Sequence, residues 1–215
     1  QVCAQSHLCA RAPARRVEIT NAESTVTSVR ERLGKDYKFV TPLAGAREEY
    51  TPAELASMVL GKIKREAEKY LDRRVERAVI TVPVSSNEDQ RQATREAMNL
   101  AGLELDRLVE EPTAACLAYG LPEVSDRYIL VYDLSRKALT ATLLEVRGRG
   151  LEAVSHGKIQ GVGGDTFTQE VMDWLATKFS QGERTNLLED RTPRKRLEHA
   201  AERAKKKLSS GRETI

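Results

Sequence analysis

The segment AVITV at residues 78–82 is the feature that most constrains what this chain can fold into. It is apolar and β-branched and it ends at Pro83, which predicts a buried strand. A helix is expected on either side of it. The first follows Thr51, which can form a capping box with Glu54. The second follows Asn87, with Gln90 placed to bond back to it, and ends at Gly102. A strand between two amphipathic helices is typical of α/β architecture.

The rest of the chain continues this alternation, and strands grouped before helices in the second half predict mixed sheets. A polar break with Pro122 divides the chain. The parts expected are an irregular tail at 1–16, a first lobe at 17–121 and a second lobe at 122–215. Apolar periodicity predicts a short helix at 22–33, an extended segment at 37–43, strands at 105–109, 128–134, 139–146 and 151–155, and helices at 113–120, 165–179 and 193–208.

The composition excludes two classes of function. Aromatic residues make up only 5% of the chain, which argues against a stacking platform for single-stranded nucleic acid. The basic runs at 11–16 and 203–207 lack aromatic partners, so each is expected to be a solvated face. No run of about 18 apolar residues occurs in the sequence. We therefore expect neither nucleic acid nor a membrane as a partner.

The three cysteines, at positions 3, 9 and 116, show no paired spacing. An odd number without a disulfide framework suits a reducing compartment, so we expect a cytoplasmic location. Cys3, His7 and Cys9 are possible metal ligands, but a fourth ligand is missing, and a loose N-terminal tail is the simpler interpretation.

Two features carry chemistry that an α/β fold can use. GVGGD at 161–165 opens a helix, and its backbone N–H groups suit a phosphate, although a tight turn without a ligand has the same composition. Asp133 ends the strand YILVYD, where open α/β sheets place ligand-contacting residues. A carboxylate there can hold magnesium through water, or it can be a solvated strand end. The residues alone leave both alternatives open.

Five segments resemble, in order and spacing, the nucleotide-binding domain of DnaK-type heat-shock chaperones. They are AVITVPVSSNEDQRQAT (78–94), LAGLELDRLVEEPTAACLAYGL (100–121), YILVYDL (128–134), VGGDTF (162–167) and LEHAAERAKKKLSS (197–210). The resemblance implies the actin-like ATPase (ribonuclease H-like) fold, in which two lobes close on ATP or ADP with magnesium. We expect this fold to be incomplete here, because the family's first phosphate loop and the later part of its second lobe have no counterpart.

The resemblance also implies roles for individual catalytic residues. Glu111 and Asp133 match the acids of the magnesium and attacking-water network, with Asp133 reaching the metal through water. Arg15 stands where the family has the lysine that stabilises the transferred phosphate.

Nucleotide binding is expected at two places. Gly163 and Gly164 lie in the glycine-rich turn that suits a phosphate. Glu202, Lys205 and Ser209 match the adenosine-contacting face of the last helix, and their spacing places them on one side of that helix.

Partners follow from the resemblance as well. Pro83 and Arg91 match residues that couple the nucleotide state to a substrate-binding domain, and Arg107 matches a position that engages J-domain co-chaperones. We therefore expect a J-domain co-chaperone and a nucleotide-exchange factor as partners. Unfolded client proteins are expected only if a substrate-binding domain is supplied.

The loop after Asp133 departs from the family pattern. It reads DLSRKALTA (133–141) where the family has a glycine-rich second phosphate loop, and side chains at this loop keep backbone amides away from phosphate. Ala138 and Thr140 replace the loop's threonine and second acid, and Arg15 does not substitute for a positioned lysine. Impaired hydrolysis is therefore expected. The alternatives are a non-catalytic scaffold remnant of the same family and a gene fragment without a selected role.

Overall fold

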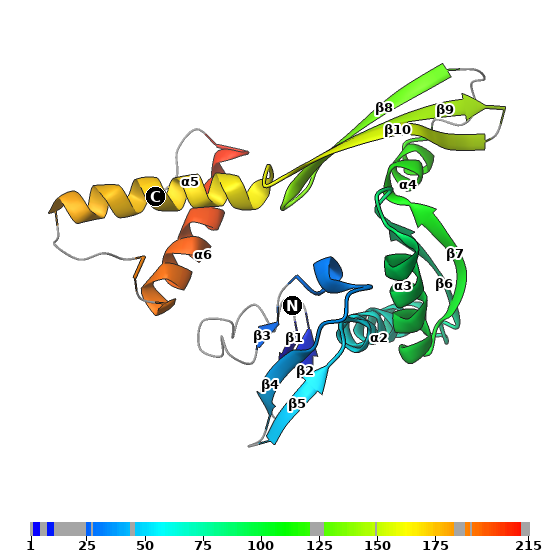
Figure 1. Cartoon of the computed structure of the whole chain (residues 1–215), viewed down its shortest axis with the longest axis horizontal. Coiled ribbons are helices and arrows are strands. Elements are labelled where there is room, and N and C mark those ends of the chain that lie inside the picture. Colours follow the sequence, from blue (N-terminus) through cyan, green and yellow to red (C-terminus); the bar gives the residue numbers. More distant parts are fainter. Residues whose placement is uncertain are drawn as a thin grey trace. The chain divides into compact units, whose positions relative to one another are not determined.

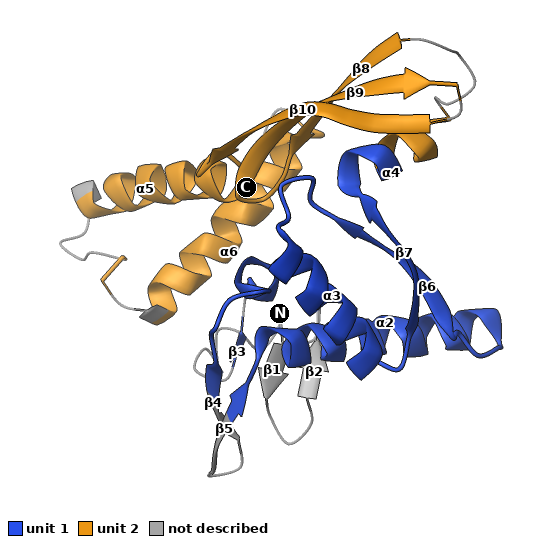
Figure 2. Cartoon of the chain, turned by 45° about the vertical axis from the view of Figure 1, so that its right-hand side comes forward, with its two compact units in different colours: residues 1–114 blue, residues 115–215 orange. Residues whose placement is uncertain are grey.

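The computed structural model describes residues 2–4, 8–10, 25–26, 28–43, 46–120, 127–148, 150–182, 188–189 and 191–211. The chain divides into two compact units, Gln1–Ala114 and Ala115–Ile215, which Figure 2 colours separately. The division lies inside α4 (Glu111–Ala118), whereas the sequence predicted a boundary between residues 121 and 122. The predicted lobes stay a prediction, and the break at 121–126 lies outside the described residues.

The first unit contains three small sheets among its described residues. Two are antiparallel, with strand orders β2-β1-β3 and β4-β5, and the third is the parallel pair β6-β7. Its elements are β1 (Val2–Ala4), β2 (Leu8–Ala10), β3 (Thr25–Val26), the 3₁₀ helix η1 (Val29–Arg32), β4 (Phe39–Leu43), β5 (Ala46–Tyr50), α2 (Pro52–Leu71), β6 (Arg77–Val82), α3 (Glu88–Leu100) and β7 (Glu104–Glu110).

Both capping boxes predicted from the sequence are confirmed. At α2, Glu54 N donates to Thr51 Oγ1 at 3.2 Å, and Thr51 N donates to the Glu54 carboxylate at 2.7 Å. At α3, Gln90 N donates to Asn87 Oδ1 at 2.9 Å, and Asn87 N donates back to Gln90 Oε1 at 3.1 Å. Each box satisfies two N–H groups that the start of a helix leaves without a partner. Gly102, with φ of 67°, follows the end of α3 as expected.

The core of the first unit forms where α2 meets β3. Leu55 on α2 is 1% exposed and Val26 on β3 is 8% exposed, so both are removed almost completely from water. Partly buried side chains pack against this pair, and they are Val29, Phe39, Tyr50, Met58 and Val59. Burying a side chain such as Leu55 stabilises a fold by about 2 kcal/mol, so this cluster fixes α2 in the unit.

The helix predicted at 22–33 is wrong in the part that the structure describes. Thr25 and Val26 form β3 instead, and only Val29–Arg32 are helical, as η1. Two physical causes explain the difference. β-Branched residues favour extended backbone, and Ser28 has φ of 60°, in the left-handed region where a right-handed helix cannot continue.

The strand AVITV is also less buried than predicted. β6, α3 and β7 form a βαβ unit in which the strands pair in parallel and α3 contacts β7. Val82 is 4% exposed, but Val79 is 54% exposed and Thr81 is exposed as well. Only one face of the pair is covered within the described residues, so the apolar run does not mark a strand buried on both faces.

The second unit contains an antiparallel sheet and two long helices (Figure 1). Its elements are the end of α4, β8 (Arg127–Leu134), β9 (Ala138–Arg147), β10 (Gly150–Gln160), α5 (Gly164–Gly182) and α6 (Arg191–Leu208). The strand order is β10-β9-β8. β10 is longer than the predicted 151–155, because it stays paired with β9 until Gln160 lies opposite Ala138. Contrary to the mixed sheets predicted, each described sheet is purely parallel or purely antiparallel. Among the strands that the structure describes, β6 and β7 are the pair joined by a crossover helix, which is the connection that parallel strands need.

Buried side chains mark two places in the second unit. On β9, Leu144 and Val146 are fully buried and Thr142 is 1% exposed. The other place is the pair of helices α5 and α6, which contact each other and bury Met172 and Ala201. Among the described residues, no helix combines the length and the apolar character needed to cross a membrane.

Replacing Thr51 by Ala tests the α2 cap. We expect the free energy of unfolding to fall by about 1 kcal/mol, because the Glu54 amide loses its acceptor. Chemical denaturation followed by circular dichroism measures this. Ser57→Ala is the matched control, since Ser57 Oγ only donates to the Glu54 carbonyl within the same helix and its loss should change stability by less than about 0.5 kcal/mol. Equal losses in the two variants would contradict the role of the cap.

Candidate functional site

Three predicted site residues of the first unit, Pro83, Arg91 and Glu111, gather at the carboxyl end of the β6-β7 pair. Val82 lies opposite Glu110 in parallel register, so both strands end at the same edge. Pro83 follows β6 directly, and Glu111 follows β7 as the first residue of α4. The residues predicted for coupling and for water positioning are therefore brought together by the βαβ unit, at the edge where open α/β sheets bind ligands.

Arg91 of α3 ties this edge together. Its Nη2 donates to Glu110 Oε1 at 3.0 Å, and its Nε donates to the Ser86 carbonyl at 3.2 Å. The Ser86 amide in turn donates to the Pro83 carbonyl at 3.0 Å. Arg91 thus connects the turn that Pro83 begins with the residue that precedes Glu111. Because one partly buried guanidinium bonds to both places, a displacement of one strand end would be transmitted to the other.

Glu111 has a partner that the sequence did not reveal. Arg30 of η1 donates from Nη1 to Glu111 Oε1 at 2.7 Å, and the Glu111 side chain is 28% exposed. The two residues are 81 positions apart, so no local spacing could have identified the pair. Arg15, the cation predicted for this chemistry, lies outside the described residues. Arg30 is therefore a cation that the structure itself places on the predicted water-positioning carboxylate.

Arg107 lies apart from this network, on the exposed side of β7. It pairs with Val79 across a register shift in which Asp106 has no opposite residue. Such a bulge re-aims the side chains next to it. Arg77 forms an ion pair with Asp106 at 3.5 Å, between two exposed side chains. The structure thus presents Arg107 on an open surface, which its predicted role as a contact for a partner requires.

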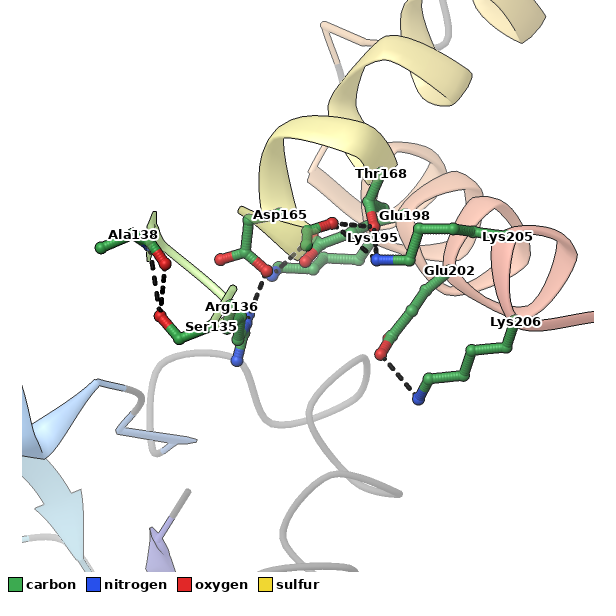
Figure 3. Close-up of polar contacts among 11 residues, drawn as sticks. Ser135, Arg136, Ala138, Asp165, Thr168, Lys195, Glu198, Glu202, Lys205 and Lys206 are labelled. Atoms are coloured by element: carbon green, nitrogen blue, oxygen red, sulfur yellow. Dashed lines mark hydrogen bonds and ion pairs between the residues drawn. The ribbon is translucent and has the colours of Figure 1, made fainter. Parts of the chain in front are cut away.

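In the second unit, the start of α5 is bonded to the turn between β8 and β9 (Figure 3). The Gly164 amide donates to the Ser135 carbonyl at 3.1 Å, and the Asp165 amide donates to the Arg136 carbonyl at 2.8 Å. The side chains add an ion pair, because Arg136 Nε donates to Asp165 Oδ1 at 2.6 Å. Two N–H groups at the start of this helix are therefore already bonded to protein carbonyls.

Gly163 makes this close approach possible. A Cβ added at Gly163 would lie 2.6 Å from the Arg136 carbonyl oxygen and 2.7 Å from the Ser135 carbonyl oxygen. Nothing larger than glycine fits there without moving the turn. Of the two interpretations of GVGGD, the geometry favours a tight turn packed against its own chain over an open phosphate cradle.

Lys205 of α6 is held against the same helix start. Its Nζ donates to the Gly164 carbonyl at 2.6 Å and to Thr168 Oγ1 at 2.8 Å. Burial lowers the pKa of Lys205 from its ordinary value, because removal from water disfavours the charged form, and nearby Asp165 opposes this shift. The ammonium thus has a defined position before any ligand arrives.

Of the other two residues predicted for the adenosine side, Glu202 lies on α6 and Ser209 directly follows the last residue of that helix, Leu208. Glu202 forms an ion pair with Lys206 at 2.9 Å, and Ser209 Oγ donates to the Lys205 carbonyl at 3.2 Å. The structure therefore places Glu202 and Lys205 near the C-terminal end of α6 and Ser209, which is exposed, directly after it.

Comparison with known proteins decides the family. A sequence model of the family described as Hsp70 protein matches residues 5–215. The chaperone protein DnaK of Thermotoga neapolitana is 41% identical over 203 residues, and the match covers 94% of this chain and 33% of that protein. The chaperone protein DnaK of Thermosipho africanus is 42% identical with the same coverage. The chain belongs to the Hsp70 family.

Membership in the Hsp70 family implies the actin-like ATPase fold, and the described α/β elements with their small sheets agree with it. The chain spans about a third of the length of the curated Hsp70 relatives that it matches.

Asp133 is the predicted magnesium residue of this Hsp70 segment. It lies one residue before the end of β8, opposite Thr140 on β9, and it is exposed. No group of three or more His, Cys, Asp or Glu side chains among the described residues could hold a metal ion by itself. A single carboxylate contacting magnesium through water does not need such a group, and magnesium commonly keeps several waters. The role of Asp133 stays a prediction.

Gly163→Ala tests the packing of α5 on the turn. The new methyl group would collide with the Arg136 carbonyl, so we expect a loss of about 1–3 kcal/mol in the free energy of unfolding. Hydrogen exchange at the Gly164 and Asp165 amides should become faster, and nuclear magnetic resonance measures it. Gly157→Ala is the control, because its added Cβ would have no atom within 4 Å. Unchanged exchange in Gly163→Ala would refute the packing.

Proposed function

We propose that this chain is part of the nucleotide-binding domain of a DnaK-type chaperone, that it binds ATP or ADP with magnesium, and that its hydrolysis is impaired. The proposal of a chaperone role is supported by the two relatives, each of which is called chaperone protein DnaK. The match to the family described as Hsp70 protein extends over residues 5–215, so it includes both groups of candidate site residues.

Impaired hydrolysis is supported by one observation above all, which is the contact between α5 and the turn after β8. Electrostatic catalysis of phosphoryl transfer needs N–H donors that are already directed at the phosphate position and not bonded to other groups. Here the Gly164 and Asp165 amides bond to Ser135 and Arg136 carbonyls instead. Loss of one such donor typically lowers the rate by about 10²–10³. A phosphate would have to break these bonds and the Arg136–Asp165 ion pair first.

The proposed nucleoside contacts are separate from the phosphate contacts, because they come from α6 and the residue after it. Glu202, Lys205 and Ser209 offer an acceptor, a cation and a hydroxyl at the C-terminal end of α6, and ribose hydroxyls and adenine nitrogens can bind such groups. The Lys205 ammonium is already positioned by Gly164 and Thr168. These contacts support adenosine binding at α6, whereas the internal bonds at the start of α5 oppose phosphate binding there.

In the first unit, Glu111 would orient the water that attacks the terminal phosphate. Its carboxylate is held by Arg30, so the cation next to the water site is a guanidinium. Magnesium, when bound, neutralises charge on the phosphates, and Asp133 would hold it through water. Arg15 remains the predicted match for the catalytic lysine. A guanidinium does not reproduce the compact point charge of a lysine, which is a second reason for slow hydrolysis.

The proposed partners use the first unit. Arg107 would contact a J-domain co-chaperone, and Pro83 with Arg91 would transmit the nucleotide state to a substrate-binding domain. A nucleotide-exchange factor is proposed on the same basis, and unfolded clients would be bound only where a substrate-binding domain is supplied. A cytoplasmic location also stays a prediction.

A second candidate function is a non-catalytic interaction protein of the same family. The same contact at α5 favours it, because a helix start whose amides are bonded internally is stable without nucleotide. The two functions differ in whether nucleotide binds at all.

The first test is ATP turnover by the purified chain. We expect no phosphate release above the background of buffer and magnesium, because the donors needed in the transition state are occupied. Single-turnover assays with radiolabelled ATP measure this. Turnover that disappears in Glu111→Ala would show that the chain hydrolyses ATP by the family mechanism and would overturn the impairment.

Thermal melting with and without magnesium and millimolar ATP tests binding. A ligand that binds the native state raises its stability by about 2.7 kcal/mol at a hundred times its Kd, so the midpoint should rise. Lys205→Ala should abolish the rise, whereas Lys207→Ala should retain it, because Lys207 is exposed in the last turn of α6. A monodisperse chain without any shift would favour the scaffold function instead.

A further inference from the structure

Thr168 is a buried polar residue of α5 to which the sequence assigned no role. It is 6% exposed, and its hydroxyl makes two hydrogen bonds. It donates to the Gly164 carbonyl at 2.9 Å and accepts from Lys205 Nζ at 2.8 Å. A hydroxyl has one donor and two acceptor sites, so Thr168 uses its only donor on α5 and offers an acceptor to α6.

The Gly164 carbonyl completes a closed triangle with these two groups. It accepts from Thr168 Oγ1 and also from Lys205 Nζ, at 2.6 Å. A lysine ammonium has three N–H donors, and two of them are directed here at fixed acceptors on α5. Because the ammonium is tetrahedral, fixing two N–H bonds also fixes the direction of the third. Figure 3 shows Thr168 and Lys205 facing each other between the two helices.

We infer that Thr168 is a positioning residue that orients the ammonium of Lys205 toward a bound nucleoside. This inference rests on the proposed function, in which Lys205 contacts adenosine. It adds Thr168 of α5 to the proposed adenosine site on α6, as the residue that positions Lys205. The hydroxyl of Thr168 determines where the third N–H of Lys205 points. It therefore influences which acceptor atom of the ligand can bond to that N–H.

A purely structural role for Thr168 would be the ordinary bond of a helical threonine to the carbonyl four residues earlier. Thr177, on the same helix, shows what that role looks like. Its Oγ1 donates to the Asp173 carbonyl at 2.8 Å, and it is exposed. Thr168 differs from Thr177 in its burial and in its contact with Lys205. Thr177 therefore provides a matched control for every effect that arises from the helix alone.

The experiment compares Thr168→Val, Thr168→Ser and Thr177→Val in the full chain of 215 residues. Valine keeps the shape of threonine without the hydroxyl, and serine keeps the hydroxyl. Two readouts are needed. The first is hydrogen exchange of the Lys205 ammonium protons, followed by nuclear magnetic resonance with ¹⁵N-labelled lysine and assigned through Lys205→Arg. The second is the affinity for ATP, measured by calorimetry.

We expect Thr168→Val to speed exchange at the Lys205 ammonium about tenfold and to weaken ATP binding by about tenfold, which is the usual effect of losing one hydrogen bond to a charged group. Thr168→Ser and Thr177→Val should stay within about twofold of the wild type in both. Wild-type exchange and affinity in Thr168→Val would overturn the inference. Equal loss in Thr168→Val and Thr177→Val would overturn it too, because the effect would then come from the helix.

The two readouts separate this inference from the proposed function. If the wild-type chain binds no ATP, the proposed function fails, and ammonium exchange alone then decides whether Thr168 holds Lys205. Unchanged exchange in Thr168→Val would then overturn the positioning role, and faster exchange would support it. If ATP binds but Lys205→Ala leaves the affinity unchanged, Lys205 does not contact the nucleoside and the inference is overturned while ATP binding stands.

Discussion

The contact between the turn after β8 and the start of α5 is the constraint on which the second unit depends. The amides of Gly164 and Asp165 donate to the carbonyls of Ser135 and Arg136, and the absence of a side chain at Gly163 lets the backbones approach. This joins the sheet to α5. Lys205 then joins α6 to the same turn of α5 through the Gly164 carbonyl. The start of α5 therefore bonds to both the β8-β9 turn and α6. Breaking the hydrogen bonds of its amides would affect the packing of the unit as well as the binding of a ligand there.

In the first unit, the candidate site residues are oriented by two adjacent carboxylates. Glu110 and Glu111 end β7 and begin α4, and each is paired with an arginine from a different element, Arg91 of α3 and Arg30 of η1. Ion pairs that are partly exposed contribute little stability, about 0–1 kcal/mol each, so they do not explain the fold. Their effect is orientation. Two like charges side by side are kept pointing to separate cations, which leaves Glu111 in one defined direction.

Much of this could be predicted from the sequence, and the failures have physical causes. The capping boxes of α2 and α3 depend on residues three positions apart, so the local sequence was sufficient for them. The helix predicted at 22–33 failed because Ser28 lies in the left-handed region and because Val26 packs in the core against Leu55, a contact distant in sequence. The Arg30–Glu111 pair could not be predicted for the same reason. The substituted loop at 135–137 is recognisable from its residue types, but its bonds to the α5 amides depend on the fold and cannot be read from the sequence.

Occupied amides and a positioned lysine at one helix start have opposite consequences for a nucleotide. A phosphate would have to displace bonds that hold the β8-β9 turn to α5, so the cost of its binding includes the loss of packing at Gly163. On the proposed function, a nucleoside would contact Lys205 without displacing its bonds to Gly164 and Thr168, because these leave one N–H of the ammonium for another acceptor. On the proposed function, most of the binding free energy therefore comes from the adenosine end. A site of that kind can retain its ligand after it has lost the means to hydrolyse it.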